Sequence, residues 1–377
     1  MIQKQPIPCI APGCVNAGMP ILEIDTRRAI SPYEFLPSWF FYTPVVIQSF
    51  FQGIKYVDWR LPLIVNPSIK LSGMVGESKH DILSLAGDNA KEWISPFTTR
   101  TKSALTIEQQ TQLAQEAMNA AQLDFPVVAK PDLGCRGVGV KLITNQAKLS
   151  DYIASFPISA RFLLQKKAIY SAEAGVFYVR YPGEDKGKII SLTLKYAPSV
   201  MGDGRHTLRE LIEACPRAGA LKHLYFPRHI HLLDDVVEAG KEFQLAFAGS
   251  HSRGSIFRDG NQFITEELAS KLDQIFDDIE DFHYGRLDIK FDDINSFMQG
   301  ERFTILEING ASSEAAHIWD RNTPLKEIFS TLLKQYRILF DIGAKQKKRG
   351  YKSPPISSLF KAWREEKLLT QQYPSTD

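Results

Sequence analysis

The chain has 377 residues, of which 44% are hydrophobic and 11% aromatic, and this composition excludes disordered and fibrous proteins. The length suffices for two or three packed domains. The formal net charge is only +2, so we expect no nucleic acid partner. Four cysteines are few for a disulfide scaffold and lack zinc-site spacing, and the first residues show no signal peptide, so we expect a cytoplasmic protein.

The charge is unevenly distributed along the chain. From residue 343 to the end, eight Lys or Arg stand against three acidic residues, which leaves a charge of −3 on the remaining 342 residues. Five of these cations lie within 345–352, and an apolar stripe of Leu359, Phe360, Trp363 and Leu368 follows. We expect a solvated basic tail over 343–377, with peripheral contact to an anionic membrane as the alternative.

An uncharged, largely apolar stretch occupies residues 35–54 and is just long enough to span a bilayer. Pro37, Pro44, Gln48 and Gln52 disfavour a spanning helix because they break it or add polar cost. We therefore expect buried core or the wall of a substrate pocket, with contact to a membrane interface as the alternative.

Elements alternate between helix and strand through most of the chain, which predicts an α/β (α+β) fold. Thr106 with Gln109 and Thr207 with Glu210 form capping boxes, and a third helix begins at Thr265. Changes in composition predict four units, which are an N-terminal domain over 1–78, a central unit over 79–188, a third unit over 189–342 and the tail over 343–377.

Two predicted strands over 285–292 and 303–310 carry the strongest candidate site. The two-residue period places Arg286, Asp288 and Lys290 on one face of the first strand, and Ile305, Glu307 and Asn309 opposite Leu306 and Ile308 in the second. The short connection predicts antiparallel neighbours, so Asp288, Glu307 and Asn309 can converge as oxygen ligands for Mg²⁺. The alternative is an ordinary amphipathic hairpin with a solvated polar face.

A glycine-rich loop follows the predicted strand that contains Lys130. Gly134, Gly137 and Gly139 allow backbone N–H groups to close on an anion. No GKS or GKT sequence follows and the next element is a strand, which excludes a Walker loop and a dinucleotide fingerprint. We expect a hairpin lid over phosphates, with an ordinary turn as the alternative.

Four motifs now stand in order: Lys130-Pro131 with its glycine loop, GDGRHT at 202–207, GRLD at 285–288 and LEIN at 306–309. In this order they resemble the ATP-grasp superfamily over about residues 76–319, most closely the D-alanine–D-alanine ligase and cyanophycin synthetase-like branches. The resemblance implies an ATP-grasp fold, in which two α+β subdomains grip ATP and a smaller N-terminal domain precedes them.

The resemblance also implies roles for individual residues. Lys79 and Lys130 look like the phosphate-binding lysines, Gln165, Lys166 and Ala168 like the hinge that holds adenine, and Glu173 like the acid at the ribose hydroxyls. Lys195 and Arg286 are the expected catalytic cations, and Asp288, Glu307 and Asn309 would hold Mg²⁺ or Mn²⁺. Solvated or surface positions are the alternatives for Lys79 and Lys195.

The implied activity is that of an ATP-dependent carboxylate–amine ligase that works through an acyl phosphate. The expected partners are a small carboxylate and an amine, neither of them identified, and an oligomer is compatible with the sequence. Arg253 and Arg258 are expected to hold a carboxylate or phosphate of the substrate, with solvated loop arginines as the alternative. Two other functions stay open, a small-molecule kinase of this fold and a non-catalytic nucleotide-binding module at a membrane surface.

Overall fold

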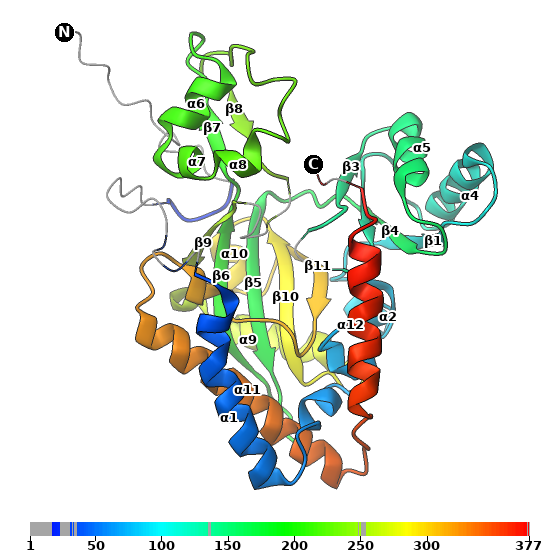
Figure 1. Ribbon diagram of the computed structural model, residues 1–377, viewed down its shortest axis with the longest axis vertical. Coiled ribbons are helices and arrows are strands. Elements are labelled where there is room, and N and C mark those ends of the chain that lie inside the picture. Colours follow the sequence, from blue (N-terminus) through cyan, green and yellow to red (C-terminus); the bar gives the residue numbers. More distant parts are fainter. Residues whose placement is uncertain are drawn as a thin grey trace.

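The computed structural model describes residues 17–22, 31, 33, 36–134, 137–247, 249, 254–374 and 376. In this part of the chain, two antiparallel sheets form the body of the molecule, and a small two-stranded sheet lies to one side (Figure 1). The fold is thus a mixed α/β one with antiparallel sheets, as the alternating pattern predicted.

The smaller main sheet has the order β1-β4-β2-β3, and helices α4 and α5 pack on it. Its elements are β1 (Phe97–Thr101), α4 (Ile107–Ala120), β2 (Val127–Pro131), β3 (Lys141–Ile143), α5 (Gln146–Ser155) and β4 (Arg161–Lys166). The capping box at the start of α4 is present, because Thr106 accepts from the Gln109 N–H at 3.2 Å while Gln109 caps the Thr106 N–H.

The larger sheet has the order β11-β10-β5-β6-β9. Its strands are β5 (Ala172–Val179), β6 (Lys188–Tyr196), β9 (Ile256–Asp259), β10 (Tyr284–Phe291) and β11 (Phe303–Asn309). One face packs on α9 (Glu266–Phe276) in the main hydrophobic core, together with α2 (Lys79–Leu83), α3 (Asp88–Lys91) and α10 (Ile294–Met298). The sheet boundary therefore falls between Lys166 and Ala172, because β5 pairs with β6 and β10, rather than at the expected residue 188.

The opposite face of the larger sheet is covered at one end only. There, Phe177 and Tyr284 pack with Leu339 and Ile342 of α11 (Leu325–Lys348). The 3-10 turns Leu61–Ile64, Lys70–Gly73, Asn261–Phe263 and Ala316–Trp319 complete this body. The rest of this face is not covered by a described helix, and it lines a pocket.

A separate small lobe contains β7 (Ser199–Met201), α6 (Leu208–Ala214), α7 (Pro216–Ala220), α8 (Lys222–Tyr225) and β8 (Glu242–Gln244) around its own hydrophobic cluster. The predicted capping box of Thr207 and Glu210 opens α6. Cys215 in this lobe is disulfide-bonded, although the four cysteines of the chain did not indicate a disulfide scaffold.

Strand β11 contains a bulge that the two-residue period does not predict. Asp288 pairs with Glu307, but the next residue, Ile289, pairs with Ile305, so Leu306 is the extra residue. Ile305 consequently points into the core, where it is fully buried, and Leu306 turns toward the pocket. The expected placement of these two residues was therefore wrong, whereas Glu307 and Asn309 do share the pocket face.

The apolar stretch forms most of α1 (Ser38–Tyr56), which continues through Pro44. Its inner side packs on α11 through Phe41 and Val45, but its outer side exposes six large apolar residues. The prediction of buried core is thus confirmed only for the inner side of this helix. Among the described residues, no helix has both the length and the apolar character that crossing a membrane requires.

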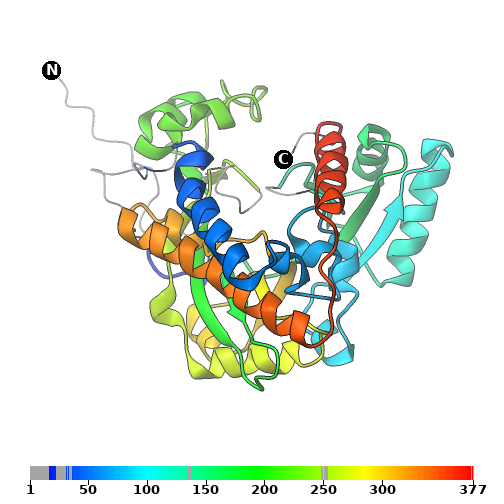
Figure 2. The same cartoon turned by 60° about the horizontal axis from the view of Figure 1, so that its bottom comes forward.

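The C-terminal region is folded rather than an extended tail. The predicted break at Gly343 lies inside α11, where a Cβ would come within 2.3 Å of the Leu61 carbonyl oxygen. Helix α12 (Ile356–Thr370) then returns toward the smaller sheet, and the Gly76 N–H donates to Glu366 at 2.9 Å (Figures 1 and 2). Leu369 and Tyr373 pack against the cluster of that sheet.

Candidate active site

A pocket of about 1830 Å³ lies between the two main sheets. The open face of β10 and β11 forms its floor, and the hairpin β2–β3 with strand β4 forms one wall. The start of α1 and the second half of α12 also line it. All three predicted metal ligands and all the predicted lysines contribute to this lining.

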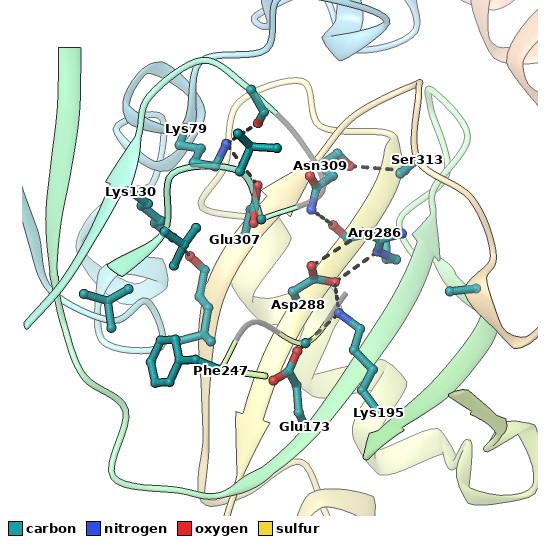
Figure 3. A pocket seen from close by; sticks show the side chains of 18 of the residues that line it. Lys79, Lys130, Glu173, Lys195, Phe247, Arg286, Asp288, Glu307, Asn309 and Ser313 are labelled. Atoms are coloured by element: carbon teal, nitrogen blue, oxygen red, sulfur yellow. Dashed lines mark hydrogen bonds and ion pairs between the residues drawn. The ribbon is translucent and has the colours of Figure 1, made fainter. Parts of the chain in front are cut away.

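Two carboxylates stand at the centre of the floor. Asp288 and Glu307 are direct partners in the antiparallel ladder of β10 and β11, and Asn309 follows two residues along β11 (Figure 3). Because the bulge comes after this pair, Glu307 and Asn309 stay on the same face of the sheet. The structure therefore brings the three predicted oxygen donors to one surface of the pocket.

Asp288 is held by two cations. The Lys195 Nζ lies 2.9 Å from its Oδ1, and the Arg286 Nε donates to the same oxygen at 3.0 Å. Burial alone would raise the pKa of Asp288, but Arg286 and Lys195 outweigh it and hold the pKa well below the usual range. The carboxylate is therefore ionised at any physiological pH.

Lys79 and Lys130 approach the other carboxylate from the opposite side. The Lys79 Nζ is 3.4 Å from Glu307 and donates to the Gly134 carbonyl at 2.7 Å, and the Lys130 Nζ donates to the Leu306 carbonyl at 3.0 Å. Both lysines are buried. Burial lowers the pKa of Lys130 to about 8, whereas neighbouring carboxylates overcome burial and raise that of Lys79.

The donor set fits a hard divalent cation. Among the described residues, no group of three or more His, Cys, Asp and Glu side chains is arranged to hold a metal ion. The predicted set, however, consists of two carboxylates and one amide, and Mg²⁺ typically takes only one or two carboxylates and completes its shell with phosphate oxygens and water. Asp288 and Glu307 satisfy that requirement because both line the pocket.

The glycine-rich loop contributes two of its three predicted glycines. Gly134 and Gly137 line the pocket, and both have positive φ angles, 128° and 68°, that favour glycine. Gly139 instead faces the C-terminal segment, because its N–H donates to the Thr376 hydroxyl at 3.0 Å and its carbonyl accepts from Tyr152. The structure therefore brings Gly134 and Gly137, but not Gly139, to the pocket.

Apolar side chains gather at the end of strand β4, and we call this part of the pocket the slot. Gln165, Lys166 and Ala168 all line the pocket, as predicted for the adenine hinge. The slot is bounded by apolar side chains from both sheets, which are Val128, Val140, Leu142, Ile169 and Leu306. Gln165 also donates to the Leu306 carbonyl at 3.2 Å and so joins the two sheets at this point.

Glu173, the residue predicted for the ribose hydroxyls, also lines the pocket. It is buried on β5 and pairs with Lys290 at 3.1 Å and with Lys195 at 3.4 Å. Burial would raise its pKa, but the two lysines lower it below the ordinary value. Lys290 was not among the predicted site residues, although the two-residue period placed it on the same face of the strand as Asp288.

The two predicted substrate arginines are not both placed at the pocket. Arg253 lies outside the described residues. Along β9, Phe257 lines the pocket while Arg258 points to the other side of the strand, where its guanidinium is 3.6 Å from Asp320. The structure does not bring Arg258 to the site.

Several pocket residues were not predicted from the sequence. Glu77 accepts from the Gly310 N–H at 2.8 Å, and burial raises its pKa to about 8. Glu314 lies beside Trp319, and burial raises its pKa as well. The lining also includes Trp363, Glu366, Lys367 and Thr370 of α12. The only sequence signal for Glu77 is its position two residues before Lys79, one of the predicted phosphate-binding lysines.

A sheet with facing carboxylates, opposed by a glycine-containing hairpin with its lysine, resembles the architecture of ATP-grasp enzymes, as the motifs indicated. No family model matches the chain, and no curated protein does. Solved structures do match, and those described next are ATP-grasp enzymes.

One match is the bifunctional glutathione synthetase from Pasteurella multocida, at 14% identity over 68% of this chain and 35% of that one, with a TM-score of 0.35. A second is the D-alanine–D-alanine ligase from Bacillus anthracis, at 12% identity over 75% and 72% of the two chains, with a TM-score of 0.39. A third is the VanG D-Ala:D-Ser ligase from Enterococcus faecalis, at 12% over 72% and 64%, with a TM-score of 0.40.

The chain spans only about a third of the glutathione synthetase and less than two thirds of VanG. Because the identities are 12 to 14% and the TM-scores are 0.35 to 0.40, the activity has to be inferred from the pocket itself.

Proposed function

We propose that this protein is an ATP-dependent ligase that joins a carboxylate to an amine through an acyl phosphate. One observation carries the proposal: Asp288 and Glu307 are paired in register inside a pocket between two sheets, and Lys79, Lys130, Lys195 and Arg286 surround them. In this proposal the two sheets with their helices are the subdomains that grip ATP, with adenine in the slot beside β4.

Before the ligands bind, the cations and carboxylates of the site neutralise one another. Lys79 pairs with Glu307, and Lys195 pairs with Asp288. A bound Mg²⁺ held by Asp288, Glu307 and Asn309 would neutralise phosphate oxygens. The lysines can then turn to the phosphates, which a buried cation binds strongly because little water competes.

The first step of the proposed reaction is phosphoryl transfer. A carboxylate oxygen of the acid substrate attacks the γ-phosphorus, the bond to the β,γ-bridging oxygen breaks, and ADP leaves with that electron pair. Lys79 and Lys130 lie on the glycine-hairpin side of the pocket and would position and neutralise the phosphates. The cationic surroundings lower the repulsion between the two anions.

The second step forms the amide. The amine attacks the acyl carbonyl, a tetrahedral oxyanion forms, and inorganic phosphate leaves as the carbonyl is restored. Arg286 lines the pocket beside Asp288 and would stabilise the oxyanion. The amine must give up a proton, and the departing phosphate, which is itself a base, can accept it.

A trapping experiment tests the reaction type. The protein is incubated with Mg·ATP, a panel of candidate acids and hydroxylamine, and we expect ADP release that depends on the acid together with a hydroxamate. Stable phosphorylated product without hydroxamate would identify a kinase instead. Nucleotide binding without ADP release that responds to any acid or alcohol would favour the non-catalytic module.

Two variants test the site. Asp288→Ala and Glu307→Ala should each lower turnover by at least about a hundredfold, because each removes a ligand of the catalytic metal. Glu301→Ala is the matched control, since Glu301 is exposed just before β11 and lies outside the pocket lining. Near-normal activity of both pocket variants would refute the metal assignment.

A further inference from the structure

The outer side of α1 is apolar and uncovered. Trp39, Val46, Ile47, Phe50, Phe51 and Ile54, which we call the α1 stripe, are each 52% to 68% exposed. At 100° per residue they share one side of the helix, opposite Phe41 and Val45, which are packed in the interior. The apolar residues of the stripe are therefore additional to those that pack α1 against the interior.

The apolar surface continues beyond the helix. Val57 is 84% exposed and Trp59 is 52% exposed, so that tryptophans stand near both ends of the surface. Eight large apolar side chains are thus exposed in one region. Monomeric proteins rarely leave contiguous apolar patches of more than a few hundred Å² uncovered. A surface of this kind indicates contact with a partner or a membrane.

The segment that holds the stripe carries only positive charge of its own, and the Tyr56 hydroxyl at its end donates to Asp341 of α11. From residue 36 to 57 the only charged residue is Lys55. The next acid, Asp58, is buried and held by two cations, Arg60 at 2.9 Å and Lys347 at 3.0 Å. One carboxylate between two cations leaves a positive surplus, and the exposed Lys348 and Lys352 follow closely along the chain.

Helix α12 presents a similar face on the other side of the pocket mouth. Ile356, Phe360 and Trp363 are 49% to 64% exposed, and Lys361 and Arg364 are exposed beside them. Figures 1 and 2 show α1 and α12 flanking the open face of the large sheet. Leu36 before α1 and Trp363 of α12 both line the pocket, so the segment before α1 and helix α12 border one opening.

We propose that the α1 stripe and the exposed face of α12 dock onto the surface of an anionic lipid bilayer. A single convex helix side offers no groove to a peptide, whereas a bilayer interface accepts it directly. Tryptophan rings sit at headgroup depth, and flanking lysines and arginines meet the lipid phosphates. The distribution of side chains around α1 matches this environment.

Vesicle sedimentation of the full chain tests the proposal. We expect binding to vesicles of phosphatidylcholine with phosphatidylglycerol, weak binding to phosphatidylcholine alone, and loss of binding as salt rises. Absence of binding to the anionic vesicles at low salt would overturn the proposal.

A double variant distinguishes binding through the stripe from non-specific hydrophobic binding. Phe50→Ser with Phe51→Ser should lower the vesicle partition coefficient by at least about tenfold, since two aromatic side chains that would be buried in the bilayer interface are lost. Ile158→Ser with Ile230→Ser is the matched control, because these residues are 65% and 56% exposed elsewhere in the molecule. An equal loss in both pairs would refute a role for the stripe, and unfolding temperatures verify that all variants fold.

A second double variant tests the cations. Lys348→Ala with Lys352→Ala should lower binding to the anionic vesicles by about thirtyfold, at roughly 1 kcal/mol for each of the two cations near the surface. Lys148→Ala with Lys188→Ala, which removes exposed lysines of α5 and β6, should change binding little. Light scattering without vesicles completes the test, because a dimer that the Phe50 and Phe51 variant dissociates would assign the stripe to a second copy of the chain and overturn the proposal.

Discussion

At the scale of single residues, the pocket concentrates buried charge in pairs that can exchange partners. Lys195 and Arg286 share Asp288, and Lys79 contacts Glu307. Buried pairs of this kind are weak evidence for stability, because desolvation offsets their attraction. Their arrangement in one pocket is better explained by a ligand that carries both negative phosphates and a positive metal.

The charge of Lys130 should make nucleotide binding depend on pH. Burial lowers its pKa to about 8, so in the ligand-free protein it is cationic below that pH and neutral above it. We expect ATP affinity to fall by roughly tenfold between pH 7 and pH 9, the value of one charge-assisted hydrogen bond. Calorimetric titration of wild type and Lys130→Arg measures this, and the arginine variant should keep a flat profile. A similar fall in both proteins would contradict the role of Lys130.

Glu77 should make folding stability depend on pH in the opposite sense from most carboxylates. Its pKa is raised from 4.5 to about 8, so the folded protein holds a proton that the unfolded chain releases, and stability falls as pH rises through this window. Glu77→Gln removes that loss and still accepts from the Gly310 N–H. We expect its free energy of unfolding to exceed that of wild type by an amount that grows by roughly 3 kcal/mol from pH 5 to pH 8, at about 1.4 kcal/mol per pH unit.

Thermal unfolding over this pH range measures the effect of the Glu77 variant. Glu301→Gln serves as the control because Glu301 is exposed. A constant difference between Glu77→Gln and wild type at all pH values would show that the carboxyl does not titrate in this window.

At the scale of elements, the glycine hairpin is held by the C-terminal segment. The Thr376 hydroxyl accepts from the Gly139 N–H and donates to the Gly137 carbonyl at 2.8 Å, and Tyr373 stacks on Phe156. This segment also connects to the larger body, since Glu366 accepts from Gly76. Helix α12 therefore bridges the two halves of the pocket.

Loosening this bridge should be visible in hydrogen exchange. Thr376→Val removes both hydrogen bonds to the hairpin while keeping the shape of the side chain, and we expect the amides of residues 137–139 to exchange roughly fivefold faster, the equivalent of about 1 kcal/mol. Amides of α9 should not change, because that helix belongs to the main core. Unaltered exchange in the hairpin would show that the segment does not restrain it.

At the scale of the whole molecule, the net charge is near zero, but the cations are concentrated in two different places. Cations inside the pocket meet carboxylates, and cations around α1 and α12 face solvent. The same C-terminal region contributes to both, because α12 lines the pocket with Lys367 and exposes Phe360 on its outer side. Docking at a membrane and access to the pocket would thus use one surface.

Much of the local structure could be predicted from the sequence. The helix starts at Thr106, Thr207 and Thr265 are confirmed, and the strand with Arg286, Asp288 and Lys290 on its polar face has the predicted alternation. The bulge at Leu306 could not be predicted, because it depends on how β11 pairs with β10 rather than on its own period. The position of Arg258 was missed because β9 has only four residues, too short for a clear pattern.

By itself, the sequence determined the caps, the strand periods and the glycine-rich hairpin, because each depends on residues a few positions apart. Only the tertiary structure decided which charges meet in the pocket, that one side of α1 stays exposed, and that the basic end of the chain returns to the site. Those features rest on contacts such as that between Gly76 and Glu366, which are 290 residues apart. No local pattern encodes such a contact, because its energy depends on where the whole core brings the two segments together.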